Sequence, residues 1–149
     1  MSSVSLALES EEARAAKMLS ISSSNAKQDQ IDKVKEMWAF NMPCLLLVNG
    51  GRPFWIAKAK QIYKLISKDI LLSVRKSLAA SLVEIARLLD LKDEEAEEER
   101  SFLVDVANNL LSDVDEVKLN LLPNVCDFIS LFPEKSQVML LSSMLRDKL

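Results

Sequence analysis

The most constraining feature of the chain is a repeat at a distance of 43 residues. The segment that begins at Val74 returns at Val117, with a basic residue after the valine and an acidic residue further along in both copies. The apolar positions that coincide are Leu78, Leu82, Ile85 and Leu89 in the first copy and Leu121, Val125, Phe128 and Phe132 in the second. Self-similarity of this kind is the signature of stacked supersecondary units that complete one another's core.

Composition indicates that these units are helical. Only two glycines and four prolines interrupt the 149 residues, 5% of the chain is aromatic, and 49% is apolar. Few turn residues and few aromatics disfavour an all-β fold. Helical units that recur every 40–47 residues or so are typical of HEAT and armadillo proteins. We therefore predict an all-α, HEAT/armadillo-like α-solenoid of about three stacked antiparallel helix pairs plus a terminal helix.

The spacing of apolar residues places the helices. We expect a Ser-rich N-terminal segment, residues 1–24, with at most one short helix and a turn at residues 22–25, followed by the array at residues 25–149. Pro43 should bend a helix, and Asn49-Gly50-Gly51 should end it, because glycine adopts the left-handed conformation found after helices. First helices are expected at 6–20, 53–67, 98–112 and 134–148, and second helices at 27–48, 73–90 and 115–132.

Some side chains are assigned to the core from this spacing. A stripe on the helix before Gly50 is expected to be buried: Ile31, Val34, Trp38, Met42 and Leu45. Cys44 and Cys126 lie in apolar runs and are expected to be buried, reduced and unpaired. Trp38 and Trp55 are interpreted as core residues, although a tryptophan can also anchor a partner.

Charge is unevenly distributed along the chain. Residues 52–92 carry nine basic and three acidic side chains, whereas residues 93–116 carry ten acidic side chains and one arginine. A nucleic-acid-binding protein normally shows basic excess without such an acidic neighbour, so we expect no nucleic acid partner. The N-terminus lacks a signal-peptide pattern, and no apolar run is long enough to cross a membrane. We therefore expect a cytoplasmic or nuclear protein without a membrane partner.

The usual catalytic and metal-binding patterns are missing. The chain has no histidine, no paired Cys-x-x-Cys motif and no glycine-rich phosphate loop after a strand. Asp113 and Glu116 are interpreted as a helix capping box rather than as half of a calcium loop. The sequence therefore predicts a non-enzymatic protein without a cofactor or a metal.

One edge of the array is the best candidate for binding. In stacked hairpins, the turns that join first to second helices line up, and loops on a rigid scaffold commonly carry function. We predict partner contacts from seven residues there: Lys68, Asp69, Arg75, Asp113, Asp115, Glu116 and Lys118. The alternative is that they only cap helices and form ion pairs from Asp to Arg or Lys between repeats. The two roles are compatible.

These residues also resemble a known family. Val74-Arg75-Lys76-Ser77-Leu78-Ala79 is similar to a second helix of the HEAT repeats in phosphatase scaffolds. Further similar motifs follow in the same order: Met42-Pro43, Asn49-Gly50-Gly51-Arg52, Glu84-Ile85-Ala86, Asp113-Val114-Asp115-Glu116-Val117-Lys118 and Asp127-Phe128. The resemblance implies a regulatory scaffold that binds the catalytic subunit of a protein phosphatase 2A-like, phosphatase 4-type serine/threonine phosphatase along the predicted edge. The acidic run at residues 93–99 is this chain's own.

Two further expectations concern partners. A general HEAT or armadillo adaptor for a peptide or a transport cargo is the alternative function, although only Asn120 and Asn124 suggest the asparagine ladder that such adaptors use. The last helix, from Glu134 to Leu149, is apolar on more than one side. Because a terminal helix should be polar outward, we expect a second copy of the chain to cover it, or further repeats of a longer array.

Overall fold

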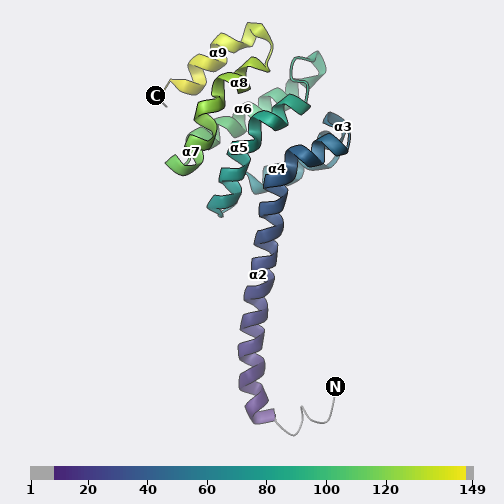
Figure 1. Ribbon diagram of the computed structural model, residues 1–149, viewed down its shortest axis with the longest axis vertical. Helices are drawn as coiled ribbons and strands as arrows, with labels where there is room; N and C mark the ends of the chain where they lie inside the picture. The colour runs from purple at the N-terminus through teal and green to yellow at the C-terminus, as the bar shows by residue number, and fades with distance from the viewer. Residues whose placement is uncertain (1–8, 147–149) are drawn as a thin grey trace. The chain divides into compact units, whose positions relative to one another are not determined.

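The computed structural model describes the backbone of residues 9–146 and the side chains of residues 25–146, and this part of the chain is all-helical without β-strands. Contacts divide the chain into two units, residues 1–34 and 35–149, each described by itself. The ribbon is drawn in Figure 1. Helix α2 (Glu9–Val48) begins in the first unit and ends in the second.

Helix α2 corrects two expectations. The predicted turn at residues 22–25 is wrong, because helix runs continuously from Glu9 to Val48 and joins the two helices expected at 6–20 and 27–48. Ser and Asn only weakly disfavour helix, and neither Gly nor Pro interrupts residues 9–42. The helix also continues through Pro43. Residues 6–8 of the first predicted helix lie outside the described residues.

The buried face of α2 differs in part from the predicted stripe. Ala39, Met42 and Leu46 are fully buried, whereas Ile31 and Val34 are exposed in the first unit. Trp38 is partly buried against the core. The predicted core assignment of Ile31 and Val34 is therefore wrong, because an apolar stripe shows which residues share a helix face but not whether another helix covers that face.

The predicted glycine stop after α2 is confirmed. Gly50 and Gly51 have φ angles of 98° and 76°, and the Gly51 amide donates to the Leu46 carbonyl over 2.7 Å. The next helix follows at once, with Pro53 in its first turn. It comprises α3 (Arg52–Phe54), the π-helix η1 (Trp55–Ala59) and α4 (Lys60–Ile66). Trp55 is fully buried, as predicted.

The remaining helices follow with short connections: α5 (Leu72–Leu88), η2 (Glu94–Ala96), α6 (Glu97–Leu111), α7 (Asp115–Leu121), η3 (Leu122–Asn124), α8 (Val125–Ser130) and α9 (Glu134–Leu145). Helix α5 packs against α6 and α7, α6 packs against α7, and α8 packs against α9. Figure 1 shows these helices side by side. Most bounds lie within about two residues of the prediction, and residues 147–148 of the last predicted helix lie outside the described part.

The two copies of the sequence repeat occupy equivalent places. Val74 and Val117 are both fully buried in the first turns of α5 and α7, and each helix starts after an extended residue, Leu71 and Val114 respectively. Burial also agrees down each copy: Leu78, Leu82, Ile85 and Leu89 are buried, as are Leu121, Val125, Phe128 and Phe132. Pro123 interrupts only the second copy, because it removes an amide donor, and η3 separates α7 from α8 there.

Both cysteines correct the prediction of burial. Cys44 on α2 and Cys126 on α8 are free and exposed. The apolar neighbours of the cysteines in the sequence were therefore a poor guide to burial.

Candidate protein-interaction edge

The seven predicted site residues lie on one structural feature, which we call the ridge: residues 67–71 and 112–114 with the first turns of α5 and α7 that follow them. Arg75 joins its two parts. Its Nε donates to Asp113 Oδ2 over 2.8 Å, and a second guanidinium nitrogen donates to Asp113 Oδ1 over 3.3 Å. A third nitrogen donates to the carbonyls of Asp69 and Ile70. Arg75 thus fixes both turns at once, as a planar guanidinium with five donors can.

Asp113 is held as a carboxylate by these contacts. Its side chain is 18% exposed, and the Val114 amide also donates to it over 2.7 Å. Burial opposes ionisation, but the hydrogen bonds from Arg75 and Val114 outweigh burial and lower the pKa of Asp113. The predicted capping box is wrong, because Val114 is the N-cap residue of α7 and no side chain caps that helix. Arg75 claims the carboxylate instead.

Asp69 forms the same kind of contact with α2. Lys35 Nζ lies 2.8 Å from Asp69 Oδ2, and the Leu71 amide donates to Oδ1 of the same carboxylate. Burial opposes ionisation here too, and the hydrogen bonds from Lys35 and Leu71 lower the pKa of Asp69 below its ordinary value. The sequence analysis missed Lys35. A cation that recurs at Lys35, Arg75 and Lys118, spaced by 40 and 43 residues, is the signal that could have found it.

A second contact accompanies each of these ion pairs. Glu36, which follows Lys35, accepts a hydrogen bond from Ser73. Lys76, which follows Arg75, lies 3.9 Å from Glu116. We call each such set of contacts a rung: a cation on one helix pairs with an aspartate in the turn that precedes the next second helix. The ridge therefore contains two successive rungs, one formed by Lys35 and one formed by Arg75. The expected ion pairs from Asp to Arg or Lys are present.

The other four predicted residues are mostly exposed. Lys68, Asp115 and Glu116 are exposed, and Lys118 is partly buried. Lys68, Asp115 and Lys118 have no ion-pair partner within residues 25–146. Lys68 lines a groove of about 400 Å³ with Lys64, Asn108 and Asn109. The ridge thus combines a braced set of residues with an exposed set of mixed charge.

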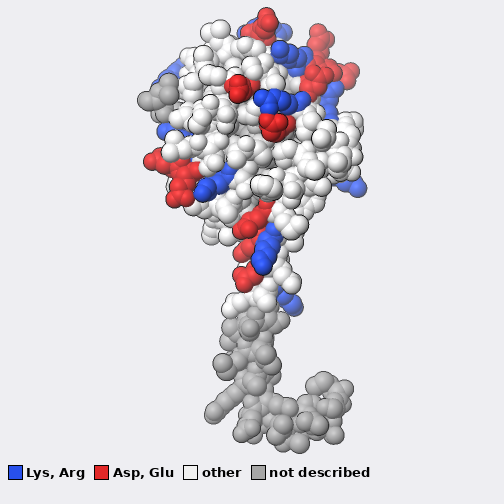
Figure 2. All heavy atoms as spheres, viewed as in Figure 1, with Lys and Arg blue, Asp and Glu red and all other residues white. Residues whose placement is uncertain are grey.

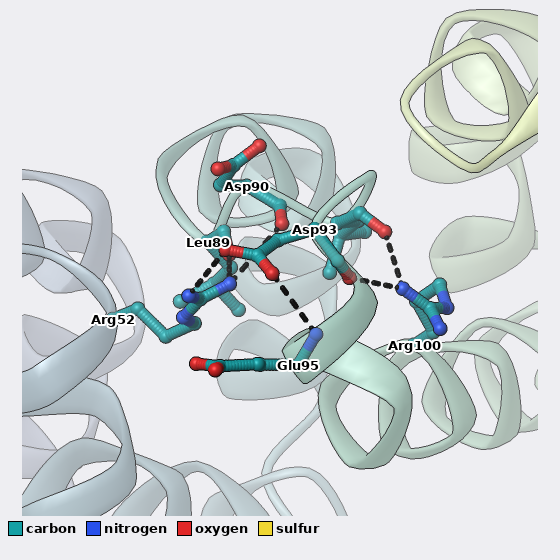
Figure 3. Close-up of polar contacts among 7 residues, drawn as sticks. Arg52, Leu89, Asp90, Asp93, Glu95 and Arg100 are labelled. Atoms are coloured by element: carbon teal, nitrogen blue, oxygen red, sulfur yellow. Dashed lines mark hydrogen bonds and ion pairs between the residues drawn. The ribbon is translucent and has the colours of Figure 1, made fainter.

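The opposite turns are braced by arginines that the sequence analysis did not single out. Arg52 donates to Asp93 over 2.9 Å and to the carbonyls of Leu89 and Asp90, and Arg100 donates to the Asp93 carbonyl over 2.6 Å (Figure 3). The Glu95 amide and Arg52 together lower the pKa of Asp93. Asp90 sits at a φ of 50° in this turn. Arg52, Asp93 and Arg100 thus direct their hydrogen bonds to one another and to backbone groups of this turn (Figure 3).

Aromatic side chains fill the space between α4 and α6. Trp55, Tyr63 and Phe102 lie with ring centroids 5.4–6.2 Å apart, and Lys60 Nζ lies 5.3 Å from the centre of the Phe102 ring. Lys60 also lies 3.9 Å from the buried Glu99. Burial raises the pKa of Tyr63, so its hydroxyl stays protonated. These contacts join η1 and α4 to α6.

The face drawn in Figure 2 shows acidic and basic side chains next to one another, with wide uncharged areas between them. Among the described residues, no cluster of three or more His, Cys, Asp or Glu side chains could hold a metal ion. No described helix is long and apolar enough to cross a bilayer. No family model, no curated protein sequence and no solved structure matches the chain.

Proposed function

We propose that the chain is a non-catalytic scaffold of HEAT type that binds the catalytic subunit of a 2A-like, phosphatase 4-type serine/threonine phosphatase through its ridge. The observation that carries the proposal is the rung between Arg75 and Asp113. It joins two helix pairs whose second helices, α5 and α7–α8, have the same burial pattern at a distance of 43 residues. This equivalence supports the proposed HEAT-type array, in which neighbouring units complete one another's core.

The ridge supports a binding role because one set of its residues holds the turns in place while another set is exposed. Asp69, Arg75 and Asp113 spend their hydrogen bonds inside the chain and hold the turns in place. Lys68, Asp115 and Glu116 project from these fixed turns with both signs of charge. A mixed, preorganised set of charges favours one partner of complementary pattern and sets the orientation of docking.

The runner-up is an adaptor that binds an extended peptide along the second helices. That role requires amide side chains that are available for a peptide backbone. Asn120 instead donates to the Glu116 carbonyl over 2.6 Å, so its amide is used within α7. This contact favours the phosphatase scaffold over the peptide adaptor.

A binding titration with a purified phosphatase 4-type catalytic subunit tests the proposal. We expect saturable binding by the wild type. The double variant Lys68→Glu, Glu116→Lys should weaken this binding at least tenfold, because each reversed charge would then face a group of the same sign on the partner. Lys92→Glu is the control, since Lys92 is exposed in the opposite turn and should bind as the wild type does. Absence of wild-type binding would rule the proposal out, and loss of binding by the control would place the contact elsewhere.

A further inference from the structure

The second unit presents uncharged helices at both of its ends. The two longest stretches without Lys, Arg, Asp or Glu in the whole sequence are residues 37–51 and residues 136–145. The first covers the C-terminal part of α2 and the second covers most of α9. A helix that is apolar on all sides is normally buried on all sides. Each of these helices nevertheless has large exposed apolar side chains, with Phe40 74% and Val138 79% exposed.

The exposed side chains form a hollow at each end. On α2 a groove of about 350 Å³ is lined by Met37, Trp38, Asn41, Cys44 and Leu45. Between α8 and α9 a groove of about 240 Å³ is lined by Cys126, Ile129, Ser130, Gln137, Val138 and Leu141. Neither groove contains a charged residue. Two uncharged grooves can be buried against each other without leaving a charge unpaired.

The two ends are also complementary in helix order. In two places a first helix precedes a second helix that contributes to a rung: α4 precedes α5, and α6 precedes α7–α8. Helix α2 carries rung residues like a second helix, through Lys35 and Glu36, but no described first helix pairs with it. Helix α9 follows α8 as a first helix would, and no second helix follows it in residues 9–146. A helix in the role of α2 placed beside α9 would therefore complete a pair of a first and a second helix.

The rungs indicate that stacking continues beyond α7. Lys35 and Arg75 each reach an aspartate of the next turn, whereas Lys118, at the corresponding place of the last second helix, has no ion-pair partner within residues 25–146. Helix α7, which packs against α5, therefore carries a cation that could form a further rung with another helix pair. A further second helix beside α7–α8 would continue that established interface.

We infer that a second copy of the chain covers this end, so that residues 37–48 of its α2 pack on α8 and α9 and complete the unpaired hairpin. The inference rests on the proposed stacking but not on phosphatase binding. The contact is head-to-tail, because it uses a different surface on each copy. Such heterologous interfaces form rings when the rotation closes and open chains when it does not.

Cross-linking between Cys44 and Cys126 tests this contact directly. Cys44 lines the groove on α2 and Cys126 lines the groove between α8 and α9, so the inferred contact brings these two exposed cysteines together. A short bismaleimide should therefore link Cys44 of one copy to Cys126 of another. Cys44→Ser alone and Cys126→Ser alone should give no cross-link, and a mixture of the two variants should give a dimer and nothing larger.

Three results would overturn the inference. One is that the wild type stays monomeric by light scattering across a concentration series and gives no cross-link. Another is that a single-serine variant cross-links with itself, which would mean a symmetric interface that uses one end twice. The third is that the mixture of the two variants yields no dimer.

Charge placed in either groove provides a second test without cysteine chemistry. Met37→Glu charges the groove on α2 and Val138→Glu charges the groove between α8 and α9, and both side chains are exposed, so the fold of each variant should persist. Each variant alone should be monomeric, while the two mixed should form a dimer that grows no further. Leu65→Glu is the matched control, since Leu65 is 77% exposed on α4 and should leave the association of the wild type unchanged. Failure of these variants to alter association would contradict the head-to-tail contact, whatever the outcome of the phosphatase titration.

Discussion

At the scale of single residues, Arg75 determines how the ridge is built. Its guanidinium serves the Asp113 carboxylate and the carbonyls of Asp69 and Ile70, and its side chain is only 19% exposed. The neighbouring Lys76 makes a longer, 3.9 Å contact with Glu116 in solvent. Partly buried, hydrogen-bonded pairs contribute more than exposed pairs, because water screens them less.

The first prediction compares these two neighbours. Arg75→Ala should lower the free energy of unfolding by about 1.5–3 kcal/mol, because Asp113 loses its charged donor in a partly buried site. Lys76→Ala should change it by less than about 1 kcal/mol, as is usual for exposed pairs. Urea denaturation monitored by circular dichroism measures both values. Equal effects of the two substitutions would show that the Arg75 rung does not hold the turns.

The second prediction concerns pH. The folded-state pKa values of Asp69 and Asp113 lie below the ordinary value of 3.8, so the unfolded chain binds protons first as the pH falls. The stabilisation is complete above about pH 4 and is lost as the pH drops through the lower folded-state values. In thermal melts below pH 4, Asp113→Asn and Arg75→Gln should each show a shallower loss of stability than the wild type. A wild-type slope in both variants would contradict this assignment.

At the scale of elements, the connection between α2 and α3 sets where the first rung stands. Gly51 has φ 76° and ψ −125°, a conformation open essentially to glycine alone, and a Cβ atom there would lie 3.2 Å from the Leu88 carbonyl oxygen. Gly50 has φ 98°, but a Cβ atom at Gly50 would meet nothing within 4 Å. The turn is therefore both strained for other residues and packed against the end of α5.

The third prediction uses this contrast. Gly51→Ala should destabilise the fold by more than about 1 kcal/mol, because backbone strain and a close contact add together. Gly50→Ala should cost less, since only the backbone term applies. Chemical denaturation of the two variants gives the comparison, and a larger loss for Gly50→Ala would contradict the described turn.

Much of the element order could be predicted from the sequence, and the failures have physical reasons. Periodicity located α5, α6 and α9 and the buried residues Leu78, Leu82 and Ile85, because a helix with a covered face needs apolar residues at that spacing. The same periodicity misplaced Ile31 and Val34, and the apolar runs around Cys44 and Cys126 misplaced both cysteines, because neither pattern shows whether another helix covers that side. The serines before Asn25 suggested a turn, but their weak preference is overridden inside a long helix.

The sequence could not show which of the predicted ridge residues form bonds within the chain and which are exposed. Asp113 stands three residues before Glu116, the spacing of a capping box, yet Arg75 from a distant part of the chain takes its carboxylate. The spacing of local motifs carries no information on a cation 38 residues away. The Arg52 contacts to Asp93 escaped the sequence analysis for the same reason.

At the scale of the whole molecule, we propose that a row of helix pairs holds the ridge in place so that another protein can bind it. Arg75 forms hydrogen bonds at the N-terminal end of α5, and Arg52 forms hydrogen bonds just after its C-terminal end. Both edges retain exposed charged side chains, but on the ridge Lys68, Asp115 and Glu116 stand beside two turns that Arg75 joins. We therefore expect the proposed phosphatase catalytic subunit to cover the ridge and not the opposite turns.

Hydrogen exchange of the chain, with and without the purified catalytic subunit, measures this most directly. We predict slower exchange on binding at the backbone amides of residues 67–71 and 112–118, with no change at residues 89–95 in the opposite turn. Slower exchange at residues 89–95, with none along the ridge, would contradict the account.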